Sequence, residues 1–219
     1  MRIKLFIIIS LLLTATIPVF SIKGFCSPKP HEAQLEATEA AVEGLPIFLE
    51  AIPLQELDRF NFNSPQELNR ATLGEPFRIF TITTQDILSY DGQTQIGELI
   101  TAIDIWYFPV MVEGRARTLL GVEKTGGVWK AASIGSSQLA EEWSRVQETY
   151  PTQLGFQKKF VRIYQATSDF VLLDQPQESS VLLPLRSAGI ALGLEHRKPH
   201  SPKDVLMEMK ETVLRNLEM

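Results

Sequence analysis

The spacing of hydrophobic residues is helical at both ends of the chain and changes in between. Residues 33–41 are rich in alanine and glutamate, which favours a helix. The next apolar residues recur at helical spacing; they are Leu45, Phe48, Leu49 and Ile52. Gly44 separates the two stretches, so we expect two short helices. A C-terminal helix is predicted by one apolar stripe, formed by Val205, Leu206, Met209, Val213 and Leu217.

Two serine-proline pairs predict helix starts. Ser64-Pro65-Gln66-Glu67 fits a capping box, in which the serine oxygen accepts from a free backbone N–H and the glutamate reaches back. Ser201-Pro202 repeats the arrangement before the C-terminal helix. We expect Ser64→Ala to cost about 1 kcal/mol of stability.

The middle of the chain reads as strands. Residues 103–112, 116–123 and 128–134 are largely apolar or alternating, and Glu113-Gly114 and Gly126-Gly127 separate them. Glycine-containing turns between such runs predict a three-stranded antiparallel meander. Pro109 lies inside the first run and indicates a sheet edge or a bulge, because proline cannot donate to a strand ladder.

Further strands are expected at residues 77–82, 160–164, 170–173 and 181–185. A helix capped by Ser136 or Ser137 is expected to follow the meander and to end before Pro151. This order predicts an α+β fold: a mostly antiparallel sheet packed by N-terminal, middle and C-terminal helices. We expect a single domain over residues 33–219.

Two parts of the chain have weakly similar sequences. The run Leu73–Phe80 resembles Leu154-Gly155 together with Phe160–Tyr164. One interpretation is coincidence between two apolar β segments. The other is a duplicated unit, with halves at residues 72–150 and 154–217 that pair in one continuous sheet.

The first 21 residues have the anatomy of a secretory signal peptide. Arg2 and Lys4 precede an apolar run, and the run ends near Ser21. We expect cleavage between Ser21 and Ile22, a disordered leader over residues 22–32, and a secreted protein, periplasmic or extracellular. The alternative is an uncleaved membrane anchor over residues 5–22, the shortest length that spans a bilayer.

Charge excludes some partners. The chain carries a formal net charge of −5, and removal of Arg2 and Lys4 with the signal leaves 19 basic against 26 acidic residues, a net of −7. An acidic surface repels phosphate backbones, so we expect no nucleic-acid partner. No basic cluster favours membrane binding by the mature domain, unless the N-terminal segment stays uncleaved.

No catalytic, cofactor or metal motif stands out. His196 and His200 have the spacing of a two-histidine metal face, but Pro199 between them breaks the helix that this spacing needs. Cys26 is the only cysteine, so an internal disulfide is excluded, and it lies in the leader. Ser136 lacks the second glycine of a nucleophile elbow. We therefore predict no catalytic residue, cofactor or metal ligand.

The best functional lead is an aromatic and basic recognition patch on the meander. Arg115 and Arg117 are one alternation apart and share a strand face. Trp106, Tyr107 and Trp129 lie nearby in the same meander. The alternative is that both tryptophans are core residues and the arginines are on the solvated side.

Several motifs together resemble a group of secreted bacterial proteins of unknown function. They are Ala71–Phe77, Trp106–Val110, Gly126–Trp129 and Phe160–Tyr164. The resemblance covers about residues 45–217 and consists of apolar and turn residues that mark a fold. It implies no activity and assigns no functional residue.

These observations predict a non-enzymatic binding or interaction module of the cell envelope, with an envelope protein, peptide or glycan as its partner. One alternative is a hydrolase-type enzyme, which needs a pocket with convergent polar groups. Another is a propeptide-like or inhibitory module, which predicts a protruding strand edge.

Overall fold

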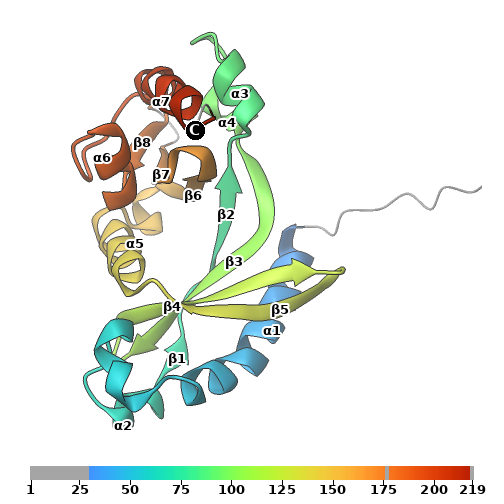
Figure 1. Cartoon of the computed structure of the whole chain (residues 1–219), viewed down its shortest axis with the longest axis vertical. Helices are drawn as coiled ribbons and strands as arrows, with labels where there is room; N and C mark the ends of the chain where they lie inside the picture. The colour runs from blue at the N-terminus through green and yellow to red at the C-terminus, as the bar shows by residue number, and fades with distance from the viewer. Residues whose placement is uncertain (1–29, 176–177, 218–219) are drawn as a thin grey trace, which may run out of the picture.

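The computed structural model describes residues 30–175 and 178–217 and has an α+β fold built on one eight-stranded sheet (Figure 1). The sheet order is β5-β4-β3-β2-β6-β7-β8, and the short β1 pairs with β3 off this path. All pairs are antiparallel except β2 with β6. The predicted fold class, a mostly antiparallel sheet with several helices, is confirmed.

The strands are β1 Thr72–Leu73, β2 Phe77–Thr81, β3 Thr101–Val112, β4 Arg115–Thr125, β5 Val128–Gly135, β6 Gln157–Ile163, β7 Ser168–Asp174 and β8 Val181–Pro184. The α-helices are α1 Pro30–Glu50, α2 Pro65–Leu68, α3 Thr84–Ser89, α4 Ile96–Leu99, α5 Ser137–Thr149, α6 Arg186–Leu192 and α7 Pro202–Leu217. Three 3-10 turns complete the described chain: η1 Leu54–Phe60, η2 Thr152–Leu154 and η3 Tyr164–Ala166.

The meander β3-β4-β5 forms where the sequence predicts it. Its second turn, Gly126-Gly127, has positive φ at both residues, 60° and 84°. Its first turn, Glu113-Gly114, has φ of 51° and 76°. Positive φ at both central positions matches the right-handed twist of the paired strands. The glycine turns therefore fix the register of this half of the sheet.

Pro109 lies inside the sheet beside a bulge, and not at an edge. β3 pairs with β4 on one side and with β2 and β1 on the other. The backbone N–H of Gly74, in the break between β1 and β2, donates to the Pro109 carbonyl at 2.7 Å. The ladder to β4 shifts register between Val110 and Met111. Pro109 thus occupies a place where the neighbouring strand is interrupted.

The expectation of two N-terminal helices is wrong, because α1 runs unbroken from Pro30 to Glu50 through both Gly44 and Pro46. A Cβ at Gly44 would collide with the Ala131 methyl group of β5. Glycine is therefore needed here for close packing of helix on strand. Pro46 lies on the exposed side of α1, and burial of Leu45 and Leu49 offsets its missing hydrogen bond.

The start of α2 also differs from the predicted capping box. The Ser64 side chain makes no capping hydrogen bond. The Glu67 carboxylate instead accepts from the backbone N–H of Asn63 at 2.8 Å and from the Asn63 side-chain amide at 3.0 Å. In a standard capping box the glutamate accepts from the N–H of the N-cap residue, but here Glu67 accepts from the residue before it. Glu67 is therefore the side chain that caps α2.

Helices cover the sheet in three places, each with its own hydrophobic cluster. α1 packs over β3, β4 and β5. α7, with α3, α4 and α6, packs over β6, β7 and β8. The pairs Arg78–Trp106 and Phe80–Val161 place these two clusters on the same face, with β2 between them. α5 covers the middle of the opposite face. On the face that α1 and α7 cover, a strip of the sheet along β2 therefore lies between the two helical layers and is covered by neither.

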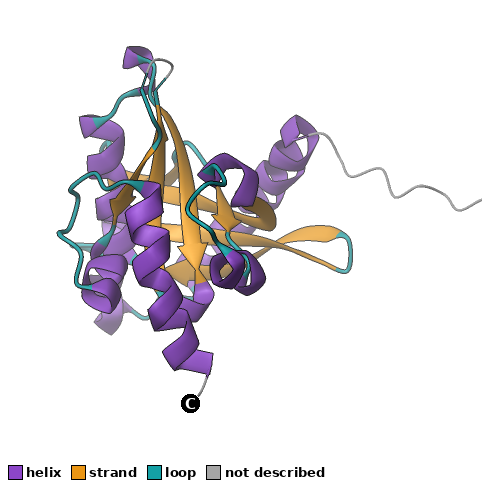
Figure 2. Ribbon diagram, turned by 90° about the horizontal axis from the view of Figure 1, so that it is seen from above, coloured by secondary structure: helices purple, strands orange, loops and turns teal. Residues whose placement is uncertain are grey.

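The β4-β5 hairpin projects from the side of the molecule, as Figure 2 shows from above. β5 is the last strand of the sheet order, and α1 crosses one face of it. Within the described residues, no helix has the length and apolar character needed to cross a membrane. The predicted signal peptide, its cleavage site at Ser21 and Ile22, and Cys26 lie outside the described residues.

Two substitutions compare how much a buried side chain and a residue at a helix start contribute to the stability of the fold. Trp129 is 6% exposed, so Trp129→Ala is expected to cost roughly 3–5 kcal/mol. Ser64→Ala removes no capping hydrogen bond and is expected to stay within about 0.5 kcal/mol of the parent. Denaturant unfolding of both variants checks this, and a larger loss for Ser64→Ala than for Trp129→Ala would contradict the packing described here.

Candidate functional site

The five residues of the predicted recognition patch do not form one surface. Trp106 and Trp129 are buried in the cluster under α1, at 7% and 6% exposure. Tyr107 packs against the cluster on the opposite face. Arg115 and Arg117 lie at the start of β4, next to α5. The alternation of β3 itself separates Trp106 from Tyr107, because neighbouring residues of a strand point to opposite faces.

Tyr107 belongs to a tightly bonded cluster around Arg162. The Arg162 guanidinium donates to Asp169 at 2.7 and 3.2 Å and to the Tyr107 hydroxyl at 2.8 Å. It also lies 5.5 Å from the ring centres of Tyr107 and Phe160. Burial works to lower the pKa of Arg162, but the hydrogen bond and charge of Asp169 more than offset it and raise that pKa. These groups are already paired with one another.

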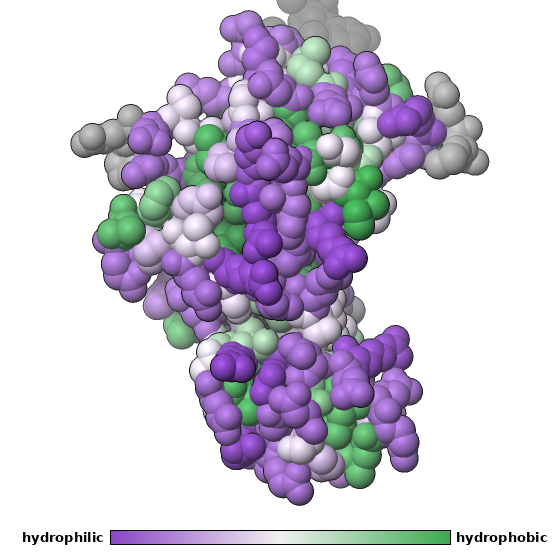
Figure 3. Space-filling view, turned by 90° about the vertical axis from the view of Figure 1, so that its left-hand side faces the viewer, coloured by the Kyte–Doolittle hydropathy of each residue, from purple (hydrophilic) through white to green (hydrophobic). Residues whose placement is uncertain are grey.

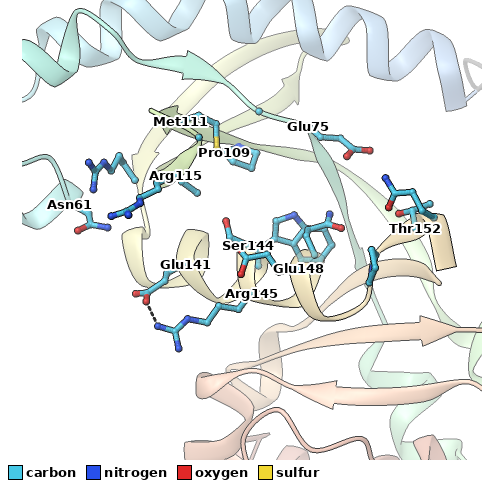
Figure 4. Close-up of a pocket in the computed structure, with 18 residues that line it drawn as sticks. Asn61, Glu75, Pro109, Met111, Arg115, Glu141, Ser144, Arg145, Glu148 and Thr152 are labelled. Atoms are coloured by element: carbon cyan, nitrogen blue, oxygen red, sulfur yellow. Dashed lines mark hydrogen bonds and ion pairs between the residues drawn. The ribbon is translucent and has the colours of Figure 1, made fainter. Parts of the chain in front are cut away.

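A cleft of about 710 Å³, which we call the α5 cleft, lies between α5 and the adjoining ends of β1, β3 and β4 (Figure 4). Its apolar floor is formed by Pro109, Met111, Ala116 and Trp143. Its rim carries Glu75, Arg115, Arg117, Glu141, Arg145 and Glu148. In Figure 3 the left-hand face narrows to a waist between an upper and a lower part.

Three of the six rim charges of the α5 cleft are in ion pairs among the described residues. Arg145 forms an ion pair with Glu141 one turn earlier on α5 (Figure 4). Arg117 donates to Glu67 at 2.7 Å, and both side chains are about nine-tenths buried. Arg115 is exposed and has no ion pair among the described residues. The cleft therefore presents mixed charge around an apolar floor.

Arg117 reaches Glu67 because of an irregularity in β4. Val110 pairs with Thr118 and Met111 with Ala116, so Arg117 is an extra residue in the ladder. A bulge of this kind re-aims the side chains beside it. Simple alternation predicts a shared face for Arg115 and Arg117, and both line the α5 cleft. Arg117, beside the bulge, also bonds Glu67 of α2.

The Glu67 carboxylate links the start of α2 to β4, because it bonds both Asn63 and Arg117. Its hydrogen bond from the Asn63 backbone N–H, with further contributions from the Asn63 amide and Arg117, lowers its pKa against the opposing effect of burial. The ionised form is thus the form that the folded protein favours.

A second cleft of about 570 Å³, the β2 cleft, lies at the starts of β2 and β6, with residues of α1 on one side and of α5 on the other. Its walls are apolar and largely aromatic: Pro76, Phe77, Phe80, Ala102, Trp106, Trp143 and Phe156. Its charged side chains are Arg78, Lys158, Lys159 and a single acid, Glu75. His31 and Gln34 of α1 complete the lining. Cations therefore outnumber acids in the lining of the β2 cleft, although Asp104 and Asp174, outside the lining, pair with two of them.

The three cations of the β2 cleft are held in different ways. Arg78 donates to the Ile103 carbonyl at 2.9 Å and to Asp104 at 3.0 Å. Lys159 donates to Asp174 at 3.1 Å. Among the residues that the structure describes, Lys158 donates only to neutral oxygens, the Tyr150 carbonyl at 2.6 Å and the Thr152 hydroxyl at 3.1 Å.

Lys158 is the cation best placed to gain an anionic partner. Its burial lowers the pKa of the ammonium group, while the charge of Glu75 works in the opposite direction. A partly desolvated ammonium without a carboxylate contact is stabilised by an incoming anion more than a fully hydrated lysine is.

The two clefts adjoin each other. Glu75, Trp143, Gln147 and Thr152 line both of them. Together they form a groove that runs along α5 and round the start of β6. Alternation and motif spacing cannot reveal this groove, because its cations come from β2 and β6, which are about eighty residues apart in the chain.

The histidines lie apart. His196 lies on the loop between α6 and α7, and its Nε2 atom contacts Oε1 of Glu142 on α5 at 2.6 Å. His200 forms an isolated backbone bridge with Leu182. Across residues 30–175 and 178–217, no group of three or more His, Cys, Asp and Glu side chains is arranged to hold a metal ion.

Comparisons of the chain with protein-family models, with curated proteins and with solved structures find no match.

The Glu67 cap gives a pH-dependent prediction. A carboxylate whose folded-state pKa is lowered stabilises the fold above its ordinary pKa of 4.5, and this contribution is lost as the pH falls through the lowered value. Glu67→Gln should therefore melt below the parent at pH 7, and the difference should shrink below pH 4.5. Thermal melts from pH 7 to pH 3 check this; a difference that grows toward acid pH would contradict it.

Proposed function

We propose that this chain is an exported, non-enzymatic binding module of the cell envelope, and that the groove formed by the α5 and β2 clefts binds an acidic peptide segment of a partner protein. The observation that carries the proposal is Lys158, a partly buried cation of the β2 cleft whose hydrogen bonds within the described residues go to the neutral oxygens of Tyr150 and Thr152.

The chemistry of the lining matches such a ligand. A carboxylate of the segment would pair with Lys158, and further carboxylates would add to the existing ion pairs of Lys159 with Asp174 and of Arg78 with Asp104. Cations beside aromatic walls lose water on binding, so each ion pair contributes more there than on an open surface. Apolar side chains of the segment would rest on the floor of the α5 cleft at Pro109 and Met111.

The shape of the groove favours an extended chain over a compact molecule. The clefts have volumes of about 710 and 570 Å³ and share four lining residues. A small ligand is usually enclosed in one pocket of similar size. The two adjoining clefts instead offer an apolar floor in one and cations in the other, which suits a peptide that extends across both.

Fluorescence anisotropy with a labelled peptide, in which glutamate alternates with phenylalanine or serine, tests the proposal. We expect Lys158→Gln with Lys159→Gln to weaken binding about tenfold, equivalent to about 1.4 kcal/mol. The matched control, Lys198→Gln with Lys203→Gln, removes two exposed lysines elsewhere and should change affinity less than about twofold.

Salt and charge provide a second readout on the unaltered protein. Affinity should fall as the salt concentration rises, because the pairs are partly exposed, and a peptide with glutamine in place of glutamate should bind weakly. Equal binding of the two peptides, or equal effects of the two lysine pairs, would overturn the proposal.

A further inference from the structure

The outer edge of β5 is a long unpaired strand edge on a projecting hairpin. β5 ends the sheet order and, within residues 30–175 and 178–217, pairs only with β4. Lys130 is its single charged residue, and Val128 beside the turn is 57% exposed. Proteins usually protect such an edge with charges, proline or a covering segment, because its free N–H and C=O groups accept another strand. β5 carries one lysine and a bulge at Ala132, where Gly121 pairs with Ser133 and Val122 with Ala131, and it contains no proline.

One flank of α1 lies beside this edge. Glu36, Ala40, Glu43 and Ile47 form a single stripe by their spacing of four, three and four residues. Gly44 packs on Ala131 of β5, and Glu36 lies 3.9 Å from Lys124 of β4. The opposite flank of α1 faces α2, through Leu45 and Leu49 near Pro65 and Leu68. The stripe therefore lies toward the open side of β5.

Charge decides what can occupy this edge. α1 contains five glutamates and no lysine or arginine, and Ile47 is 67% exposed. A second copy of the chain would bring glutamates against glutamates. A segment with basic side chains would instead neutralise Glu36 and Glu43, and its apolar parts would cover Ile47.

We propose that the β5 edge and the adjoining α1 flank bind an extended segment of a partner protein, in which basic residues alternate with small apolar residues. The segment adds to the sheet as a further strand. Its side chains point alternately to the two faces of the sheet. Basic side chains on one face meet Glu36 and Glu43, and small ones on the other lie beside the exposed Ala132 and Ser133.

This interaction surface is separate from the groove and does not depend on the proposed function. The groove attracts an acidic ligand through Lys158 and Lys159, whereas the β5 edge attracts a basic one through α1. The two surfaces can therefore be tested with peptides of opposite charge.

The probe is a labelled peptide of alternating lysine and valine. Hydrogen exchange on the unaltered protein should show slower exchange of β5 amides when the peptide is bound. Glu36→Lys with Glu43→Lys should weaken binding at least tenfold by anisotropy. The matched control Glu208→Lys with Glu211→Lys, on exposed positions of α7, changes the net charge equally and should alter affinity less than twofold.

Three results would overturn the inference. One is equal loss of affinity in the two glutamate pairs, which would indicate attraction by net charge alone. Another is loss of lysine-valine peptide binding on Lys158→Gln with Lys159→Gln, together with no protection of β5. The third is a dimer in sedimentation without peptide whose β5 amides are already protected, which would make a second copy the occupant.

Discussion

The parallel pairing of β2 with β6 is the contact on which the rest of the structure depends, because it joins two antiparallel meanders into one sheet. The ladder itself is short, with Ile79 opposite Phe160 and Phe80 opposite Val161. Side chains reinforce it. The indole of Trp143 on α5 stacks on Phe77 of β2 at 4.2 Å and meets Phe160 of β6 edge-on at 6.1 Å. One helix thus fastens both strands of the junction.

The same junction creates the groove. Each meander has its own helical layer on one face, α1 over one and α7 over the other, so the strip along β2 between them stays open. Residues just before and within β2 and β6 line the β2 cleft, among them Arg78 and Lys158. The α5 helix that fastens the junction also forms one wall of the α5 cleft. Stability of the sheet and shape of the groove therefore have a common origin.

Local patterns were sufficient to predict the fold class and the meander β3-β4-β5. Turn glycines and strand runs are short-range features, and they survive in the folded protein. The continuous α1 could not be predicted, because the reason for Gly44 is Ala131, about ninety residues away. Likewise the cap on α2 depends on a glutamate that also bonds Arg117 of β4. Both differences from the predicted structure are therefore caused by contacts between residues far apart in the sequence.

The recognition patch expected from the sequence and the groove have different cations. Arg115 and Arg117 lie on β4, whereas Arg78, Lys158 and Lys159 line the β2 cleft. Trp106 lines that cleft, whereas Trp129 is buried beneath α1. Alternation along a strand cannot tell which face a helix will cover when both faces carry apolar residues. The residues of the groove become neighbours only through the pairing of β2 with β6.

The central claim is that the ligand site lies at the junction of the two meanders. Mapping of backbone amide shifts by NMR during titration with the acidic peptide tests this most directly. The account predicts that the largest shifts fall in two separate stretches at once, residues 75–80 leading into β2 and residues 156–159 at the start of β6. Shifts confined to one of these stretches, or centred on β5 or α7, would contradict it.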